Sequence, residues 1–256
     1  MKHSLRVLEH QLMVYRRTWR GGLFTTFLAP VMFLLAMGLG LGTFVDESTS
    51  GGMEGVPYLV FLAPGLLASQ AMQTAAGESM YPIMSAITWN RTFQSMIATP
   101  IAALHVVLGT SMWMIVRLTI VSTAFVIVMI IFGATDILRG IAMLPVAVLT
   151  GLAFALPIMA YTVTRRGDSS FPAMNRFIIT PLFLFSGVFF PVTELPTFLQ
   201  PIAFVTPLWN GVSLARGIAI GNIDAPLALY NLAVLFAYCA VGLVAASRTF
   251  PRRLVQ

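Results

Sequence analysis

The residues that could carry chemistry are few, and their spacing excludes the common catalytic and metal sites. The three histidines, His3, His10 and His105, lie at or near the ends of apolar segments, and no pair of them has metal-ligand spacing with carboxylates. Lys2 is the only lysine, and the pattern G-x-x-x-x-G-K-[ST] does not occur, so the lysine that a P-loop directs at nucleotide phosphates is missing. No serine or cysteine nucleophile is paired with a histidine base inside an apolar segment. We therefore predict no catalytic residue, no metal site and no cofactor bound by this chain.

Two ionisable residues stand within the apolar segments. Glu78 lies toward the end of one segment and Arg117 lies well inside the next. Because an isolated charge is costly in hydrocarbon, we expect a salt bridge or a polar network to link them. A static packing pair and a moving gate both remain open. Transport driven by an ion gradient usually needs several ionisable groups near the midplane. A single ionisable pair therefore argues against an ion-coupled transporter.

Composition places the chain in a membrane. Hydrophobic residues make up 58% and charged residues only 9% of its 256 positions, and the mean hydropathy is +0.87. A soluble domain carries about 25% charged residues. The apolar segments approach or exceed the roughly 20 residues that a helix needs to cross a bilayer, and they do not alternate as barrel strands do. Because lipid leaves backbone polar groups to be satisfied internally, we expect an all-α polytopic membrane protein.

The expected topology has six membrane-spanning helices. They are predicted at about 22–43, 57–80, 104–132, 140–162, 173–190 and 225–246. Before them, segment 3–20 repeats large apolar residues every three or four positions, at Leu5, Leu8, Leu12, Tyr15 and Trp19. This spacing among basic residues predicts an amphipathic helix in the membrane interface, with a soluble helix packed on another subunit as the alternative.

Prolines interrupt the segment before the last span. Segment 191–220 contains Pro191, Pro196, Pro201 and Pro207 between apolar pieces that are too short to cross a bilayer. Proline at this density breaks helices. We therefore expect short re-entrant or interfacial helices here, with an ordinary loop outside the membrane as the alternative.

The segment between the second and third spans, residues 85–100, is polar enough to lie in water. After Thr88, a candidate N-cap, large apolar residues follow at Trp89, Phe93, Met96 and Pro100, with spacings of 4, 3 and 4. This period predicts one face of a short amphipathic helix that could press against a partner at the membrane surface. A solvated connector is the alternative interpretation.

Charge is distributed unevenly between the two sides that this topology creates. If both termini are cytoplasmic, twelve basic residues lie inside and two, Arg139 and Arg216, lie outside. The acidic residues on the outer side are Asp46, Glu47, Glu54, Asp136, Glu194 and Asp224. An excess of arginine in cytoplasmic loops is the usual orientation signal. We expect a cell-membrane protein with both termini in the cytoplasm, and we assign the net charge of +6 to orientation rather than to nucleic acid.

The layout and several short motifs resemble those of ABC-2 exporter permeases. The motifs are Leu62-Ala63-Pro64-Gly65-Leu66-Leu67-Ala68, Glu78-Ser79, Trp89, Arg91-Thr92, Met96, Ala98-Thr99-Pro100, Gly109 with Trp113 and Arg117, Phe185-Ser186-Gly187-Val188-Phe189-Phe190-Pro191 and Pro207-Leu208-Trp209. They are similar to the nodulation-factor (lipo-oligosaccharide) exporter branch and to the daunorubicin-resistance branch of this family. The resemblance covers essentially the whole chain.

The resemblance implies a single transmembrane domain over 1–256 that dimerises, with a homodimer favoured, and binds two separate ABC ATPase subunits that hold ATP and magnesium. Segment 85–100 would be the helix that couples to the ATPase, with Thr88, Trp89, Arg91, Phe93, Met96 and Pro100 as its contact residues. The first, second and fifth spans would line the dimer interface or the export path.

The same resemblance implies export of an amphiphilic or hydrophobic substrate, such as a drug, a lipid or a lipo-oligosaccharide. Candidates for an outer gate are the aromatic residues Phe183, Phe185, Phe189 and Phe190, although each could simply face lipid or a neighbouring helix. Two other classes of function stay open: a secondary transporter driven by an ion gradient, and a membrane scaffold that transports nothing.

Overall fold

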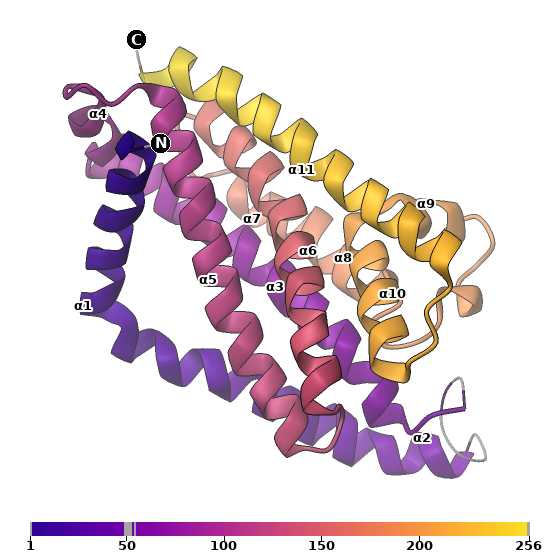
Figure 1. Ribbon diagram of the computed structural model, residues 1–256. Coiled ribbons are helices and arrows are strands. Elements are labelled where there is room, and N and C mark those ends of the chain that lie inside the picture. The colour runs from indigo at the N-terminus through magenta and orange to yellow at the C-terminus, as the bar shows by residue number, and fades with distance from the viewer. Residues whose placement is uncertain (1, 49–52, 54, 255–256) are drawn as a thin grey trace.

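The computed structural model describes residues 2–48, 53 and 55–254, and the regular elements in this part of the chain are helices (Figure 1). Glu54, which the sequence pattern assigns to the outer side, lies outside the described residues. The elements are α1 (Lys2–Phe33), η1 (Leu34–Leu41), α2 (Gly42–Ser48), α3 (Tyr58–Met84), η2 (Ser85–Trp89), α4 (Thr92–Ile97), α5 (Ala103–Ile131), α6 (Ile137–Thr164), α7 (Phe171–Met174), η3 (Asn175–Ile179), α8 (Thr180–Phe185), η4 (Val192–Glu194), α9 (Gln200–Val205), α10 (Pro207–Ile220) and α11 (Ala225–Leu254). The segments η1, η2 and η3 are π-helical, and η4 is a turn of 3-10 helix.

Five helical stretches of the described chain are long and apolar enough to cross a membrane. They are Pro30–Glu47, Tyr58–Trp89, Ala103–Ile131, Ile137–Thr164 and Ala225–Leu254. The prediction of six full spans is therefore confirmed only in part. The remaining segment, predicted at 173–190, forms the shorter helix Phe171–Phe185. At 1.5 Å per residue that helix is roughly 22 Å long, less than the roughly 30 Å of a hydrocarbon core.

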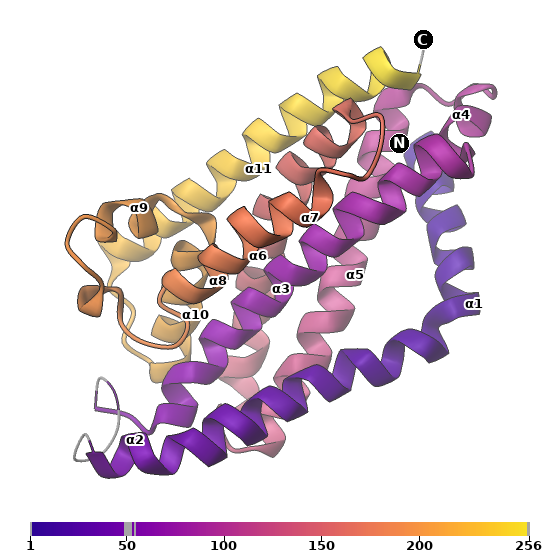
Figure 2. The same ribbon diagram turned by 180° about the vertical axis from the view of Figure 1, so that it is seen from behind.

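The N-terminal segment differs from the expected interfacial helix followed by a separate span. α1 runs without interruption from Lys2 to Phe33, with Pro30 inside it, and continues through η1 into α2. The ribbon of α1 changes direction along its length, so its first part lies against α5 while η1 and α2 lie against α3 (Figures 1 and 2). Most of the predicted apolar stripe, including Leu5, Leu12 and Trp19, is exposed and free to meet lipid.

The core of the bundle is α3, which contacts α5, α6, α10 and η1 and is buried over most of its length. Glycines permit close approach between neighbouring helices. A Cβ atom on Gly151 of α6 would lie 2.6 Å from the Leu118 side chain of α5, and one on Gly242 of α11 would lie 2.5 Å from Pro157 of α6. By contrast α11 is buried along one side only, so much of its surface is left for lipid or for a partner.

Two of the four prolines of segment 191–220 lie in the first turn of a helix rather than interrupting one. Pro201 lies in the first turn of α9 and Pro207 in the first turn of α10, where the missing N–H needs no partner. Thr206 caps α10, since its hydroxyl accepts a bond from the Trp209 N–H at 3.4 Å. α10 then packs on α3, α6 and α11. η4 and α9 are short, as predicted, whereas α10 is a longer helix of the bundle. That these short helices are re-entrant or interfacial stays a prediction.

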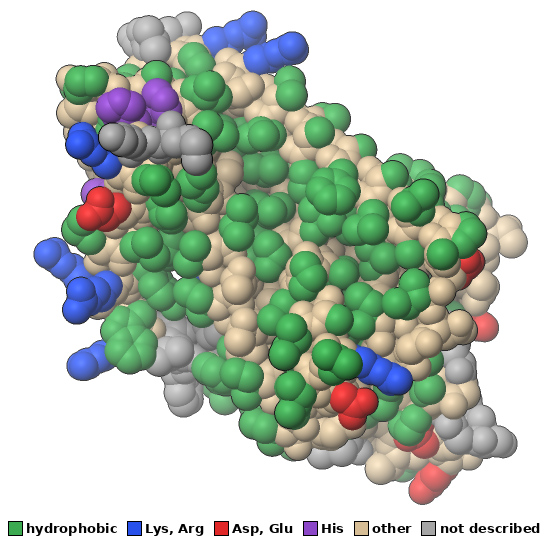
Figure 3. All heavy atoms as spheres, in the orientation of Figure 1, with side chains coloured by type: hydrophobic (Ala, Val, Ile, Leu, Met, Phe, Trp, Pro, Cys, Tyr) green, Lys and Arg blue, Asp and Glu red, His purple; other side chains and the backbone are tan. Residues whose placement is uncertain are grey.

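The two chain ends lie at the same end of the molecule as α4 (Figure 1). The α5–α6 turn and the start of α11 lie at the other end. The space-filling view shows Lys and Arg side chains at the end that carries the chain termini and along the side where the first part of α1 lies, and much of the acidic charge toward the opposite end, where one basic group sits beside it (Figure 3). The two ends of the bundle therefore differ in charge, as the sequence pattern requires.

Candidate functional site

A charged network joins three helices about halfway along α5. The Arg117 Nε of α5 donates to the Glu78 Oε1 of α3 at 2.9 Å. The two side chains are 16% and 24% exposed, respectively. Arg117 Nη1 also donates to the hydroxyl of Tyr15 on α1 at 3.3 Å, and its guanidinium lies 5.2 Å from the centre of that ring. One arginine therefore contacts both α3 and α1.

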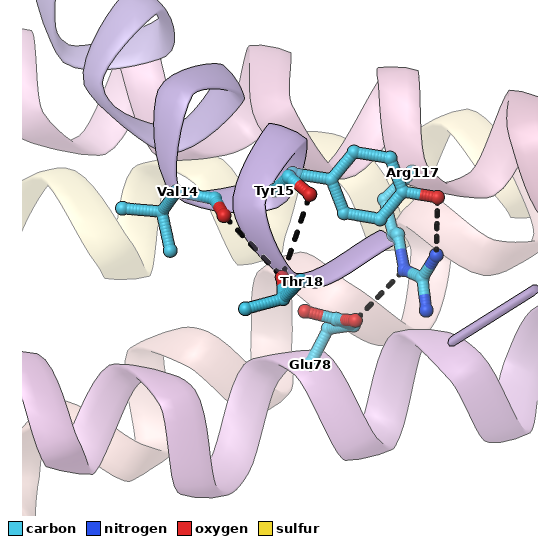
Figure 4. A network of polar contacts seen from close by, with 5 residues as sticks. All are labelled: Val14, Tyr15, Thr18, Glu78 and Arg117. Carbon is cyan, nitrogen blue, oxygen red and sulfur yellow. Dashed lines mark hydrogen bonds and ion pairs between the residues drawn. The ribbon is translucent and has the colours of Figure 1, made fainter. Parts of the chain in front are cut away.

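Close packing between α1 and α5 holds Tyr15 in this position. The Tyr15 ring lies 5.4 Å from the Trp113 ring of α5. Gly109 lies one turn before Trp113 on α5, and a Cβ atom on it would lie 2.5 Å from the Val7 Cβ of α1. Only glycine therefore permits the two helices to approach this closely. In Figure 4 the side chains of Tyr15, Thr18, Glu78 and Arg117 converge, and Thr18 donates to the backbone carbonyl of Val14 at 3.3 Å.

A cavity of about 360 Å³ lies beside the network. Its walls come from α1, α3, η2, α4 and α5 and include His10, Gln11, Glu78, Thr92, Thr110 and Arg117. The Thr110 hydroxyl is buried and has no hydrogen-bond partner among the described residues. The arrangement can hold α1 against the bundle and link it to the segment that follows α3. No described group of three or more His, Cys, Asp and Glu side chains could hold a metal ion.

The segment after α3 is not the single amphipathic helix that the spacing predicts. α3 continues as η2 through Trp89, so Thr88 lies inside a helix and is no N-cap; its hydroxyl donates to the Met84 sulfur at 3.2 Å. The Asn90 N–H donates to the Ser85 carbonyl at 2.8 Å and ends the helix there. Arg91 then adopts a left-handed conformation with φ of 51°, which turns the chain before the short helix α4.

This break separates the residues that were expected to share one face. Trp89 is 57% exposed, whereas Phe93 is 1% exposed and packs on Phe250 of α11 with ring centres 6.0 Å apart. Met96 is half-buried, and Arg91 and Pro100 are exposed. The prediction that Phe93 is available to a partner is wrong, because the reversal at Arg91 turns the face that carries Phe93 toward the core.

The four phenylalanines expected at an outer gate do not form one cluster. Phe183 lies 6.3 Å from the Phe33 ring and 5.0 Å from the Phe189 ring, both edge to face. Phe185 is exposed at the end of α8, and Phe190 packs on a small separate cluster around Val192. The structure brings Phe183 and Phe189 together and leaves the other two apart.

Sequence reasoning missed the role of Arg216 in α10, which it counted only as an outer charge. Its Nη2 donates to the Gly187 carbonyl at 2.8 Å, and its Nε donates to the Phe61 carbonyl at 3.2 Å. Its guanidinium lies 3.6 Å from the centre of the Phe61 ring. Arg216 thus ties α10 to α3 and to the loop after α8. The signal in the sequence was an arginine within an otherwise apolar stretch, which calls for partners.

Comparison with known proteins gives a consistent result over most of the chain. Residues 5–220 match the ABC-2 type transporter family. A nodulation protein J of Rhizobium leguminosarum bv. viciae is 33% identical over 227 residues, which are 89% of this chain and 85% of the relative. Another, from Bradyrhizobium diazoefficiens, is 27% identical over 250 residues, covering 98% and 93%. The inner membrane transport permease YadH of Escherichia coli is 23% identical over 202 residues, covering 79% and 78%.

Proposed function

Because the chain belongs to the ABC-2 type transporter family, we propose that it is the permease subunit of an ATP-driven exporter that moves an amphiphilic or hydrophobic substrate out of the cytoplasm or the inner leaflet. Family membership makes it a non-catalytic transmembrane subunit whose partner is an ABC ATPase. The observation that carries the proposal is the family match over residues 5–220, in a sequence without a P-loop lysine.

The segment η2–α4 is the proposed contact with the ATPase. It lies at the same end of the molecule as both termini, and it follows directly from α3, the central helix of the bundle. Trp89 and Arg91 are exposed on it, and a large exposed aromatic residue is a typical anchor in an interface. A push on η2 would reach α3, the Glu78–Arg117 pair and hence α1. This path is our proposal for how the ATPase acts on the permease.

The remaining parts of the proposal concern orientation and assembly. Both termini and η2–α4 face the cytoplasm of an inner membrane, in agreement with the excess of arginine at this end. Two permease copies, as a homodimer, bind two ATPase subunits. Some relatives are named for nodulation and one as an inner membrane permease. Lipo-oligosaccharides, lipids and drugs are the substrate classes we propose, and the low charge of the transmembrane segments supports them over small ions.

The export path is proposed to lie at the dimer interface near α8. Phe33 of α1 and Phe185 of α8 are both exposed, and Phe183 contacts Phe33 from α8. Apolar side chains from two non-adjacent helices therefore meet at the surface of one protomer. A second copy applied to this surface would enclose an aromatic passage.

Copurification tests the proposal and the coupling contact together. We expect the tagged chain, expressed with its cognate ATPase and purified in mild detergent, to retain the ATPase in a stoichiometric complex. Trp89→Ala should weaken retention at least tenfold, since truncation of an exposed aromatic anchor costs about 2 kcal/mol or more. The matched control is Phe198→Ala, which truncates an exposed aromatic residue at a distant position and should leave retention unchanged.

Phe93→Ala serves as a second comparison. Phe93 is buried in the core, so this change should lower the free energy of unfolding by about 3–5 kcal/mol. We expect its main effect on the stability of the chain and not on the binding of the ATPase. A folded chain that retains no ATPase, and that transports in proteoliposomes with an ion gradient and without ATP, would contradict the proposal. Equal loss of ATPase with Trp89→Ala and Phe198→Ala would contradict the coupling contact alone.

A further inference from the structure

An apolar groove on the surface of the bundle is separate from the network and from η2–α4. It encloses about 610 Å³ between α6, the segment α7–η3–α8, the start of α10 and α11. Figure 2 shows α7 and α8 passing in front of α6, with α11 alongside. The lining includes Phe154, Ala173, Phe177, Leu182 and Tyr238, and Phe177 and the neighbouring Ile178 are largely exposed. The groove is therefore open to whatever surrounds the bundle.

The position of the groove along α6 matches one leaflet of a bilayer. Its lining residues on this helix run from Ala153 to Tyr161, all in the half of α6 that ends at Thr164 beside the chain termini. This stretch is roughly 12 Å long at 1.5 Å per residue. One leaflet contributes about half of a roughly 30 Å hydrocarbon core. A single acyl chain thus has the right length and chemistry to lie in the groove.

The mouth of the groove carries positive charge. Arg165 and Arg166 follow directly after α6, and both are exposed. The Arg165 guanidinium lies 4.2 Å from the centre of the Tyr161 ring, which itself lines the groove. Asp168 is the acidic residue of this loop, and no ion pair among the described residues joins it to either arginine. The basic charge is thus held beside the apolar wall.

A polar side chain also lacks a partner at the mouth. Ser170 lines the groove, and its buried hydroxyl makes no hydrogen bond to any described residue. A hydroxyl donates readily to a phosphate oxygen, and a guanidinium binds phosphate through charge-assisted hydrogen bonds. The apolar wall therefore ends, at Tyr161, beside the Arg165 guanidinium, as an acyl chain ends at the phosphate of a phospholipid headgroup.

We propose that this groove binds an anionic phospholipid from the leaflet on the side of the chain termini. One acyl chain lies between α6, α8 and α11, and the phosphate lies between Arg165, Arg166 and Ser170. The site does not depend on the transported substrate, and it adds a lipid requirement to the proposed exporter. A second copy of the chain is the other occupant that an apolar surface of this kind could take, and the experiment distinguishes the two.

Native mass spectrometry of the full chain, purified in mild detergent and titrated with phosphatidylglycerol or phosphatidylcholine, tests the site. We expect at least one phosphatidylglycerol to bind more tightly than phosphatidylcholine. Arg165→Ala combined with Arg166→Ala should weaken phosphatidylglycerol binding about tenfold or more. The control is Arg16→Ala combined with Arg17→Ala, which removes the same charge from exposed positions of α1 and should have a smaller effect.

Filling the groove supplies a second variant. Ala173→Phe should displace the lipid, whereas Ala240→Phe on an exposed part of α11 outside the groove lining should not. A phospholipid with a photoreactive group on its acyl chain should label peptides that contain 153–161 or 173–182, which locates the site even where a variant folds poorly. Equal binding of the two lipids, or equal effects of the two double-arginine variants, would overturn the proposal. Conversion of a dimer to a monomer by Ala173→Phe, with lipid binding unchanged, would assign the groove to a second copy instead.

Discussion

The Glu78–Arg117 pair is the interaction on which the candidate site depends at the scale of single residues. Each charge would be costly if left alone between helices, and each is largely shielded from water. The pair is supported on one side by Tyr15, so that α1, α3 and α5 meet at one guanidinium. Arg216 plays the corresponding part at the other end of α3, where it bonds backbone carbonyls instead of a carboxylate.

We predict a strong energetic coupling between Glu78 and Arg117. Glu78→Gln and Arg117→Met should each lower the free energy of unfolding by about 2–4 kcal/mol, because each leaves a shielded charge without its partner. The double variant should cost less than the sum, by about 1–3 kcal/mol. Unfolding measured in detergent micelles for the full cycle checks this, and strict additivity would contradict a direct pair.

Two further variants test whether Glu78 is the main partner of Arg117. Exchanging the charges, Glu78→Arg with Arg117→Glu, should recover part of the expression that either single change loses. Tyr15→Phe removes only a hydrogen bond of 3.3 Å and keeps the ring against Trp113, so it should cost less than about 1 kcal/mol. A larger loss from Tyr15→Phe than from Glu78→Gln would mean that α1, and not α3, is the main partner of Arg117.

At the scale of elements, the contact between α1 and α5 decides where the N-terminal helix lies. α1 offers two faces: an exposed apolar stripe, and a face with the small residues Ser4 and Val7 that meets Gly109. The smaller face packs in the bundle because the absence of a side chain at Gly109 lets the two backbones approach closely. Leu5, Leu12 and Trp19 of the apolar stripe are left exposed for the membrane interface, whereas Tyr15 packs on Trp113 of α5.

We predict that Gly109→Ala separates α1 from α5. The added Cβ would lie 2.5 Å from the Val7 Cβ and 2.7 Å from the Ser4 carbonyl, so one helix must shift, at a cost of about 1–3 kcal/mol. Hydrogen exchange should rise in residues 3–15. Gly77→Ala is the matched control, since nothing lies within 4 Å of its new Cβ, and alanine there should be neutral or stabilising by up to about 1 kcal/mol. Similar exchange in the two variants would argue against the packing role of Gly109.

At the scale of the whole molecule, the bundle is polarised in charge. Both termini, η2–α4 and the Arg165–Arg166 loop belong to the basic end, and Asp136 and Asp224 belong to the other. The exceptions are the two basic residues that the sequence pattern places on the acidic side, Arg216 and Arg139. Arg139 is anchored there, since its Nη1 donates to the Ala219 carbonyl at 2.7 Å and its Nε lies 4.0 Å from Asp136.

This polarity predicts the orientation in the cell. In a Cys239→Ser background, which removes the single cysteine, a new cysteine at Ser169 should react with a membrane-impermeant maleimide only after the cells are opened. A cysteine at Asn222, exposed just before α11, should react in intact cells. Labelling in the reverse order would place the termini outside and remove η2–α4 from any cytoplasmic ATPase.

The membrane class, most of the spans and the need to pair Glu78 with Arg117 could be predicted from the sequence, because composition and the cost of charge in lipid act wherever the helices pack. The family could be predicted from the resemblance of the short motifs. Which face of each helix is buried depends on how the helices pack in the folded chain. The spacing of Trp89 and Phe93 could not show that α3 extends past Thr88 and that the chain reverses at Arg91, which buries one aromatic residue and exposes the other. Nor could it show that Arg216 meets the carbonyls of Phe61 and Gly187, because those groups come together only when α3, α8 and α10 are packed.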